Sequence, residues 1–393
     1  MRKVAIVSAA RTAFGKFGGS LSSLKAVDLG ATAITGALEK VSLKPSEVQY
    51  VYMGQVLQGG AGQIPSRQAA RKAEIPWDVP SVTVNKVCAS GLISVAMAAK
   101  MIAYGEIDAA VAGGMESMSQ STYMLPTARW GQRMFNLEGV DSMVHDGLWC
   151  PFYNRHMALH GSESARKFDI SREAQDEWAL RSQQRAAQAM EKGWLSEELI
   201  PVNIPQKKGA PLQVSQDEQP RPDSTIDKLA RLQPIFDPQG SVTAGNAPGV
   251  NDGGAALVLM SEEKAQELAL EPLAYYIAHQ EVALEASEMP ETPGHAINKV
   301  LKQQGMTHHD IDLYEVNEAF ASVVLVSQKV AGYDLEKVNQ QGGAIAYGHP
   351  IGASGGRILA TLIHQLRRRG GGYGIAAICS GAAQGDALLL KVE

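Results

Sequence analysis

The sequence predicts an α/β protein made of two similar halves, with a separate segment inserted between them. Three observations lead to this fold class. Short apolar runs typical of strands alternate with helical patterns along the chain. A stretch of 25 residues that starts at Ala33 has a gap-free counterpart that starts at Ala296, 263 positions later. Between the two copies, from about residue 120 to residue 249, prolines and charged residues become more frequent.

Six apolar runs are expected to form the strands of the core, because they are short and rich in β-branched or aliphatic residues. In chain order they are "VAIV" from Val4, "SVTVN" from Ser81, "AAVAGG" from Ala109, "AALVLMS" from Ala255, "IAAICS" from Ile375 and "ALLLKV" from Ala387.

A second, shorter match supports duplication of the core. "ASG" at Ala89 recurs at Ala353, 264 positions later, and each copy precedes a helical pattern and then a strand. Chance similarity between two generic helix-strand units is the alternative, but two matches in the same order favour duplication. The helix that follows Cys88 has almost no polar face from Leu92 to Ile102. We therefore expect this helix and its counterpart after Ala353 to be buried between the sheets of the two halves.

The inserted segment is expected to contain a long helix and a loop. "SREAQDEWALRSQQRAAQAMEKGW" reads as an amphipathic helix, and "PQKKGAPLQVSQDEQPRPDST" as a loop with one short strand. After it, "NDGGAALVLMSEEKA" returns to the pattern of a strand followed by a helix and completes the first half. The boundaries that we expect are 1–119 together with 250–271 for the N-terminal half, 120–249 for the insertion and 272–393 for the C-terminal half.

The composition narrows the class of protein. The chain has 393 residues, a net charge of −5 and no long basic run, which argues against a nucleic-acid-binding protein. Its three cysteines lack metal-ligand spacing, so we expect free thiols, a reducing compartment and no metal site. The apolar runs fall short of a membrane span, and the first expected strand leaves no room for a targeting peptide. These features favour a cytoplasmic protein without nucleic-acid or membrane partners.

A single cysteine stands at the start of the apolar helix, in "NKVCASGLISVAMAAKMI". Cys88 falls at a strand-to-helix junction, where unpaired backbone N–H groups and the helix dipole are expected to lower the pKa of a thiol. The alternative is that Cys88 is a small buried hydrophobic residue, which is the commonest fate of a free cysteine. This stretch alone leaves both readings open.

Two further glycine-rich segments carry reactive side chains. "QQGGAIAYGHPIGASGGR" contains His349, and "AAICSGAAQGDA" contains Cys379 at the end of an expected strand. The repeat places the His349 loop just ahead of the helix equivalent to the one behind Cys88, so both helix starts should face one crevice. A cysteine activated by a histidine is typical of nucleophilic catalysis, and a second cysteine suits a general acid or base. Backbone N–H groups beside the glycines can form oxyanion holes, and thioester chemistry fits this set.

Four motifs together resemble the thiolases, specifically the short-chain, biosynthetic acetyl-CoA C-acetyltransferases. They are "NKVCASG", "VNEAFA", "GGAIAYGHPIGASGGR" and "CSGAAQG", in the family's order and spacing, within a likeness that covers essentially the whole chain. The resemblance implies a five-layered α-β-α-β-α core and an inserted loop domain that binds coenzyme A. It also implies a ping-pong Claisen condensation of two acetyl-CoA molecules to acetoacetyl-CoA and CoA, with thiolysis as the reverse reaction.

The resemblance assigns roles to five residues. Cys88, deprotonated by His349, accepts the acetyl group, and Cys379 removes the α-proton of a second acetyl-CoA. One oxyanion hole combines His349 with a water held by Asn317, and the other uses the N–H groups of Cys88 and Gly381. Apart from coenzyme A thioesters as substrates, the resemblance implies no cofactor and no metal.

The resemblance also places the coenzyme A contacts in the insertion. The residues expected there are Leu148, His156, Met157, Arg221, Phe236 and Ala244. Pro248 departs from the family, which usually has a serine at this place that contacts the pantetheine. The family is commonly a homotetramer, and "MLPTARWGQRMF" corresponds to its tetramerising loop.

Other functions use part of the same residue set. A 3-ketoacyl-CoA thiolase of broader chain length is the nearest alternative within the family. A β-ketoacyl synthase-like enzyme ranks lower, because such enzymes usually pair the cysteine with two histidines. A Cys-His acyl-CoA hydrolase would not need Cys379, and a non-catalytic acyl-CoA-binding protein would form no acetyl adduct on Cys88.

Overall fold

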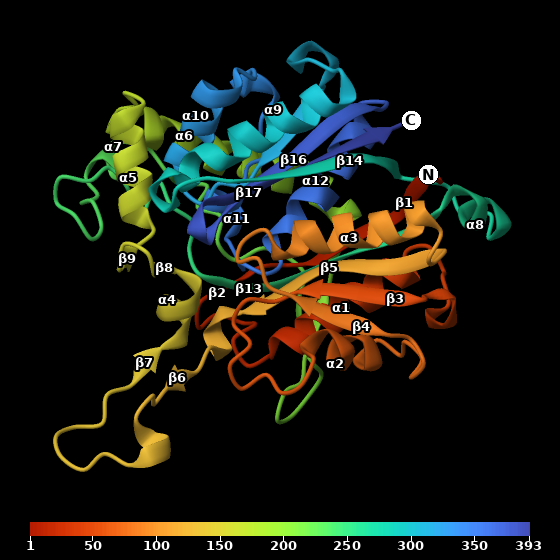
Figure 1. Ribbon diagram of the computed structural model, residues 1–393, viewed down its shortest axis with the longest axis horizontal. Coiled ribbons are helices and arrows are strands. Elements are labelled where there is room, and N and C mark those ends of the chain that lie inside the picture. The colour runs from red at the N-terminus through yellow and green to blue at the C-terminus, as the bar shows by residue number, and fades with distance from the viewer.

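The core of the molecule is one continuous mixed sheet of 11 strands (Figure 1), seen in a computed structural model that describes residues 1–393. Its main path runs in the order β15-β16-β17-β14-β1-β13-β5-β3-β4. The six runs expected to form strands are all in this sheet. The strands are β1 (Val4–Thr12), β3 (Tyr50–Gly54), β4 (Ser81–Val84), β5 (Ala109–Ser117), β13 (Asn251–Ser261), β14 (Ala274–Ala283), β15 (Leu313–Val316), β16 (Gly372–Ser380) and β17 (Gln384–Val392), with β2 (Gly15–Lys16) and β10 (Leu199–Ile200) beside β13 and β1.

The same strand order occurs twice, which confirms the duplication. With its strands numbered along the chain, the N-terminal half has the order 3-2-4-5-1. The C-terminal half has only four strands, and if the number 3 is reserved for a missing strand, its order is 2-4-5-1. An isolated parallel bridge between Tyr314 and Val338 stands where the missing third strand would lie. The repeat also fixes positions, since β3 begins at Tyr50 and β15 begins at Leu313, at the 263-residue spacing of the sequence match.

Helices divide the molecule into five layers, as the resemblance implied (Figure 1). One outer layer covers the N-terminal half of the sheet, and the opposite outer layer covers the C-terminal half. The central layer packs against both halves. The outer helices are α1 (Ala26–Glu39) and α2 (Pro65–Lys72) on one side and α9 (Thr292–Gln304) and α10 (Ala321–Ala331) on the other, and the central helices are α3 (Ser90–Tyr104) and α12 (Ser354–Arg368).

The two halves meet at a sheet joint and at a helix contact. Strands β1 and β14 pair antiparallel over three residue pairs, so the expected two sheets are continuous at their first strands. In the central layer, backbone touches backbone, because a Cβ atom built on Gly355 would lie 2.2 Å from the nitrogen of Leu92. A Cβ atom on Gly91 would likewise lie 2.9 Å from the oxygen of Gly352. Only glycine permits this approach.

The segment between β5 and β13 forms a looser layer along one side of the core, and an arm that projects away from it (Figure 1). The expected amphipathic helix and the single short strand of the loop are both present, as α6 and β12. The elements of this segment are β6 (Tyr123–Met124), β7 (Val140–Asp141), α4 (Ser142–Gly147), β8 (Trp149–Cys150), β9 (Arg155–His156), α5 (Ala158–Lys167), α6 (Arg172–Glu191), a 3₁₀ turn η4 (Trp194–Glu197), β10, β11 (Val202–Ile204), β12 (Leu212–Val214) and α7 (Ile226–Ala230).

One expectation about hydropathy is wrong. Residues Val87–Tyr104, which include α3, form a window of 18 residues that is long and apolar enough to cross a membrane. In the structure 61% of this window is buried, and α3 lies in the central layer against α12. Burial inside the protein therefore accounts for its apolar composition.

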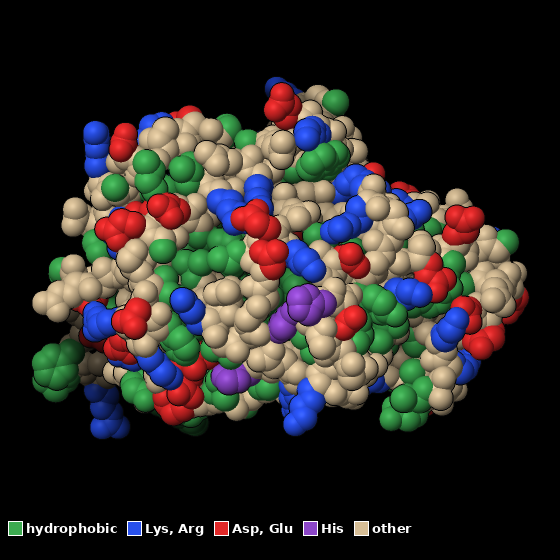
Figure 2. All heavy atoms as spheres, turned by 90° about the horizontal axis from the view of Figure 1, so that it is seen from above, with side chains coloured by type: hydrophobic (Ala, Val, Ile, Leu, Met, Phe, Trp, Pro, Cys, Tyr) green, Lys and Arg blue, Asp and Glu red, His purple; other side chains and the backbone are tan.

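The outer surface on the face shown in Figure 2 carries basic and acidic side chains in a mixed pattern, with hydrophobic patches between them. No continuous field of one sign covers this face, in keeping with the net charge of −5.

The glycine contact in the central layer can be tested by substitution. We expect Gly355→Ala to lower the free energy of unfolding by about 1–3 kcal/mol, because the added methyl group must push α3 and α12 apart. Urea denaturation would measure the change. Gly139→Ala is the matched control, since its Cβ atom would have no neighbour nearer than 3.7 Å, and it should change stability by less than about 0.5 kcal/mol. Equal effects of the two substitutions would contradict the packing argument.

Candidate active site

A cavity of about 210 Å³ opens where the two halves and the inserted segment meet. It is mostly apolar, and it contains both cysteines and the histidine that the sequence singled out. The lining residues are Cys88, Met118, Leu148, His156, Met157, Ile235, Phe236, Ala247, Pro248, Gly249, Val250, Met289, Ala319, Phe320, His349, Ile351, Cys379, Ser380 and Gly381.

Cys88 lies in the short turn between β4 and α3, ahead of the first helical residue Ser90. Its sulfur is 3.3 Å from Nε2 of His349, although the two residues are 261 positions apart in the chain. The backbone N–H groups of Cys88 and Gly381 act on this sulfur in the direction that favours the thiolate. The turn is held by Val87 in a left-handed conformation, with φ of 45°.

The expected lowering of the thiol pKa at this junction is wrong. Burial raises the pKa of Cys88 to about 12, and this effect outweighs the hydrogen bonds from the N–H groups of Cys88 and Gly381. Cys88 is 5% exposed, so its thiolate would lose most of its hydration. The free protein therefore holds Cys88 as a neutral thiol.

His349 faces Cys88 in the tautomer that a general base requires. Its Nδ1 lies 2.6 Å from the hydroxyl of Ser354, and that hydroxyl itself donates to the carbonyl of Pro350 at 3.0 Å. Because the hydroxyl proton is used, Nδ1 must donate its own proton, which leaves Nε2 unprotonated toward the sulfur. Burial lowers the pKa of His349 to about 3, so the ring is neutral.

Two buried side chains fix the loop that carries His349. Asn251 Oδ1 accepts a hydrogen bond from the backbone N–H of His349 at 2.9 Å. The carboxylate of Glu116 accepts from the N–H groups of Val56 and Gly352, each at 3.0 Å. Burial raises the pKa of Glu116 to about 7. The sequence analysis missed Glu116 and Asn251, since nothing in their local pattern relates them to a loop more than 90 residues away.

Cys379 ends β16 and enters the same cavity from the C-terminal half. Burial raises its pKa well above the ordinary value, and the neighbouring Cys88 adds to the rise. Two contacts tie the two cysteine segments together. The hydroxyl of Ser380 donates to the carbonyl of Lys86 at 2.5 Å, and Nζ of Lys86 lies 2.8 Å from a carboxylate oxygen of the buried Asp386.

Asn317 follows β15 and is fully buried, outside the cavity lining. Both polar atoms of its side chain lack a hydrogen-bond partner within the protein. An unpartnered buried amide is costly unless a water or ligand satisfies it. Its neighbour Glu318 instead has a structural role, because it accepts from Trp178, Ser182 and the backbone of Ile345.

The residues expected to bind coenzyme A fall into two groups. Five line the cavity, namely Leu148, His156, Met157, Phe236 and Pro248. Arg221 and Ala244 are exposed and lie outside the lining. The rings of His156 and Phe236 stack with centroids 4.0 Å apart, and burial lowers the pKa of His156 to about 4. The wall at this point is therefore a neutral, planar surface.

Several lining residues were not expected from the sequence. Phe320 and Ala319 belong to the "VNEAFA" motif, which gave a usable signal. Met118, Met289 and Val250 come from separate segments with no motif, and only the tertiary structure brings them together.

A duplicated α/β core with two thiols and a neutral imidazole around one apolar cavity is the arrangement of side chains that acyl transfer through a thioester requires. No group of three or more His, Cys, Asp or Glu side chains is placed to hold a metal ion. Residues 4–263 match the family model described as "Thiolase, N-terminal domain", and residues 270–392 match "Thiolase, C-terminal domain". The chain belongs to the thiolase family.

Similar proteins agree with this assignment over their full lengths. An acetyl-CoA acetyltransferase of Cupriavidus necator is 48% identical over 391 residues and covers 100% of both chains. One of Thiocystis violacea is 46% identical over 388 residues, which cover 99% of this chain and 98% of the relative. The crystal structure of the Bacillus anthracis acetyl-CoA acetyltransferase superposes with a TM-score of 0.97 at 39% identity, over 100% of this chain and 99% of the other.

The protonation state of the pair predicts the pH dependence of Cys88 modification. Since burial favours the neutral thiol, with its pKa near 12, and the neutral imidazole, with its pKa near 3, little thiolate exists at neutral pH. We expect the rate of Cys88 alkylation by iodoacetamide to rise about tenfold per pH unit between about pH 6 and 10, because the thiolate is the nucleophile. Mass spectrometry of the Cys88 peptide would measure it. A plateau that begins below about pH 7 would instead indicate a thiolate-imidazolium pair.

Proposed function

We propose that this thiolase is a short-chain acetyl-CoA acetyltransferase that condenses two acetyl-CoA molecules to acetoacetyl-CoA and CoA, and runs thiolysis in reverse. The observation that carries the proposal is the convergence of Cys88, His349 and Cys379 on one cavity. Coenzyme A thioesters are its substrates, and it uses no other cofactor.

In the first half-reaction Cys88 becomes acetylated. The thiol proton passes to Nε2 of His349 as the sulfur attacks the thioester carbon, so neither group has to be charged before substrate arrives. The tetrahedral oxyanion accepts from the N–H groups of Cys88 and Gly381, which already face the sulfur. Collapse breaks the bond from carbon to the CoA sulfur, and the departing thiolate takes a proton from Cys379, which leaves Cys379 as the thiolate and His349 protonated at Nε2.

In the second half-reaction the nucleophile is the α-carbon of a second acetyl-CoA, in place of the Cys88 thiol. Cys379, as thiolate, removes the α-proton of a second acetyl-CoA, and the raised pKa of Cys379 makes it a stronger base for this weak carbon acid. The enolate oxygen is stabilised by His349 and a water bound to the unpartnered amide of Asn317. The enolate carbon attacks the acetyl carbon, the bond to Cys88 breaks, and the Cys88 sulfur takes the proton from Nε2 of His349, while Cys379 keeps the α-proton, so all three groups return to their neutral starting state.

Coenzyme A enters along the inserted segment. Leu148, Met157 and the stacked His156 and Phe236 form the apolar wall for the pantetheine and the acyl group. The remaining contacts lie further out on the surface, at the exposed Arg221, which meets the adenine or a phosphate, and at Ala244. Pro248 stands where the family usually places serine, and it cannot donate a hydrogen bond there.

The proposal also includes the domain boundaries and the oligomeric state. We divide it into 1–119 plus 250–271, the coenzyme A-binding insertion 120–249, and 272–393, because β13 lies between β1 and β5. The projecting arm carries large exposed apolar side chains (Figure 1). These side chains form contacts between the subunits of a homotetramer in the cytoplasm. Trp130, Met134 and Phe135 on this arm are 87%, 70% and 92% exposed.

A 3-ketoacyl-CoA thiolase of broader chain length is the second candidate. The small cavity between Met157, His156 and the cysteines favours short acyl groups. Steady-state kcat/KM for acetoacetyl-CoA against longer 3-ketoacyl-CoA thioesters separates the two, and a preference for the longer substrates would refute the short-chain proposal.

Substitution of each of the two cysteines is expected to block a different step of the reaction. Cys88→Ala should abolish the acetyl adduct seen by mass spectrometry after mixing with acetyl-CoA. Cys379→Ala should still form the adduct but lose condensation by at least about 10²-fold, as expected for removal of a general base. Cys150→Ala is the control and should retain both activities. Equal loss of both partial reactions in the Cys379 variant would contradict the assigned roles, and unchanged turnover would indicate a hydrolase.

The proline in the coenzyme A wall gives a separate prediction. Pro248→Ser should lower KM for acetyl-CoA about two- to tenfold with little change in kcat, because a neutral hydrogen bond contributes about 0.5–1.5 kcal/mol. Pro248→Ala is the matched control, since it removes the ring but adds no hydroxyl. An equal decrease of KM in both variants would show that the ring, and not the missing hydroxyl, weakens binding.

A further inference from the structure

A second cavity, of about 750 Å³, lies away from the cysteines and shares no lining residue with theirs. It forms where the C-terminal end of α12 meets α6, the η4 turn and the chain around residue 340. The lining consists of three arginines, four glutamines, one tryptophan and one leucine, namely Arg185, Arg368, Arg369, Gln188, Gln340, Gln341, Gln365, Trp194 and Leu313. The volume falls in the range of ~300–1,000 Å³ typical of small-molecule sites.

The charge of this cavity is positive, since no carboxylate is among its lining residues. Arg368 is paired with Glu197 at 2.6 Å. Arg185 and Arg369 make only long contacts with carboxylates at the rim, at 3.3 Å to Glu336 and 3.7 Å to Asp312. Because Glu336 is 74% exposed, its ion pair is weak. Both guanidinium groups therefore keep N–H donors for a ligand, in the planar fork that suits phosphate oxygens.

Two glutamine side chains supply acceptors in the same cavity. Gln341 is only 4% exposed, and its Oε1 has no hydrogen-bond partner in the protein. Gln365 is 6% exposed and donates from Nε2 to the buried Glu315 at 2.8 Å, which leaves its oxygen available. A buried amide oxygen needs a donor. A dianionic phosphate ester has no O–H group to donate, but a hydroxyl or an amino group can donate.

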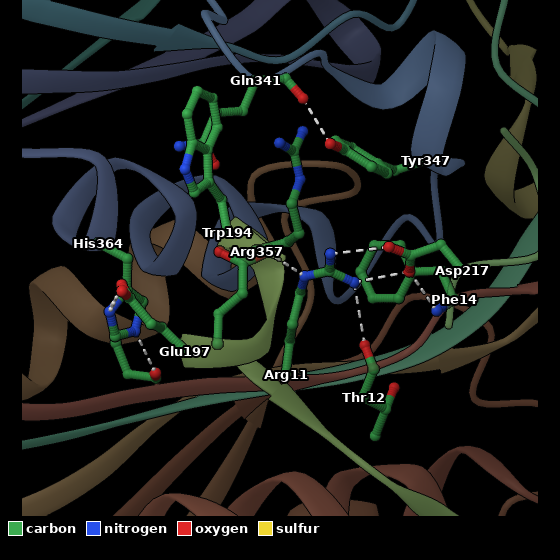
Figure 3. A network of polar contacts seen from close by, with 12 residues as sticks. Arg11, Thr12, Phe14, Trp194, Glu197, Asp217, Gln341, Tyr347, Arg357 and His364 are labelled. Carbon is green, nitrogen blue, oxygen red and sulfur yellow. Dashed lines mark hydrogen bonds and ion pairs between the residues drawn. The ribbon is translucent and has the colours of Figure 1, made fainter. Parts of the chain in front are cut away.

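An aromatic ring also lines this cavity. Figure 3 shows Trp194 and Gln341 at one end of a polar network whose other end is Arg11 bound to Asp217. The cationic groups of Lys192 and Arg368 lie 4.5 Å and 5.8 Å from the centre of the Trp194 ring. The ring thus offers a stacking surface beside positive charge.

We propose that this cavity is a second, non-catalytic site for a phosphorylated nucleoside. The phosphates bind Arg185 and Arg369, the base stacks on Trp194, and ribose hydroxyl or base amino groups donate to Gln341 and Gln365. The same chemistry occurs in free nucleotides and in the adenine nucleotide end of coenzyme A, so the test has an arm for each source.

The first arm is isothermal titration of the full-length protein with ADP and with pyrophosphate. Both should bind the wild type, and Arg185→Gln combined with Arg369→Gln should weaken both by about tenfold or more, as expected for the loss of charge-assisted hydrogen bonds. Trp194→Leu should weaken ADP but leave pyrophosphate unchanged. Arg367→Gln is the matched control, because Arg367 sits on the same helix end but lines a different cavity. The affinity of the Arg367→Gln variant for ADP should equal that of the wild type.

The second arm separates the sources by titration with coenzyme A. Two molecules bound per wild-type chain and one per chain of the double arginine variant would assign the site to coenzyme A. One molecule bound in both would assign it to free nucleotides. Thiolysis rates without added nucleotide and the thermal midpoint should match the wild type in every variant. The proposal is overturned if ADP fails to bind at millimolar concentration, or if the double variant and Arg367→Gln bind it alike.

Discussion

The contact of α3 with α12, backbone against backbone, is the constraint on which the rest of the molecule depends. Gly91 and Gly355 place no side-chain atom of their own at the closest approach, so the turns ahead of both helices lie close together. Those turns carry Cys88 and His349, which brings sulfur and nitrogen to 3.3 Å from opposite halves of the chain. A methyl group at either glycine would separate the helices, and a separation of even 1 Å is large on the scale of a hydrogen bond.

Burial decides the chemistry of the groups that this contact assembles. The two thiols have raised pKa values, and His349 has a lowered pKa, so all three groups are neutral before substrate binds. The protein therefore holds no permanent ion pair among these three groups. It supplies instead N–H donors fixed around the sulfur and a histidine locked by Ser354 in the correct tautomer. In the proposed reaction, charge is created only as the bonds change, where these fixed dipoles stabilise it most.

The sequence was sufficient for the fold and for the convergence of Cys88, His349 and Cys379 on one cavity. The 263-residue repeat predicted the paired halves, and the missing polar face after Leu92 predicted a central helix. The motifs around Cys88, His349 and Cys379 predicted one shared cavity. The raised pKa of Cys88 could not be predicted, because local position indicates a helix dipole, whereas the depth of burial depends on the whole assembly. The support of the His349 loop by Glu116 and the arginine-lined cavity were also missed, since both join segments far apart in the chain.

The central layer has a further consequence, for synthesis on the ribosome. The chain of α3 is complete at Tyr104, but the helix that covers it begins only at Ser354, 250 residues later. At about 5–20 residues per second, this interval lasts ~12–50 s. During that time an apolar helix with a membrane-like hydropathy has no permanent neighbour on one side. The nascent protein is therefore a natural client for chaperones that shield apolar segments until the second half emerges.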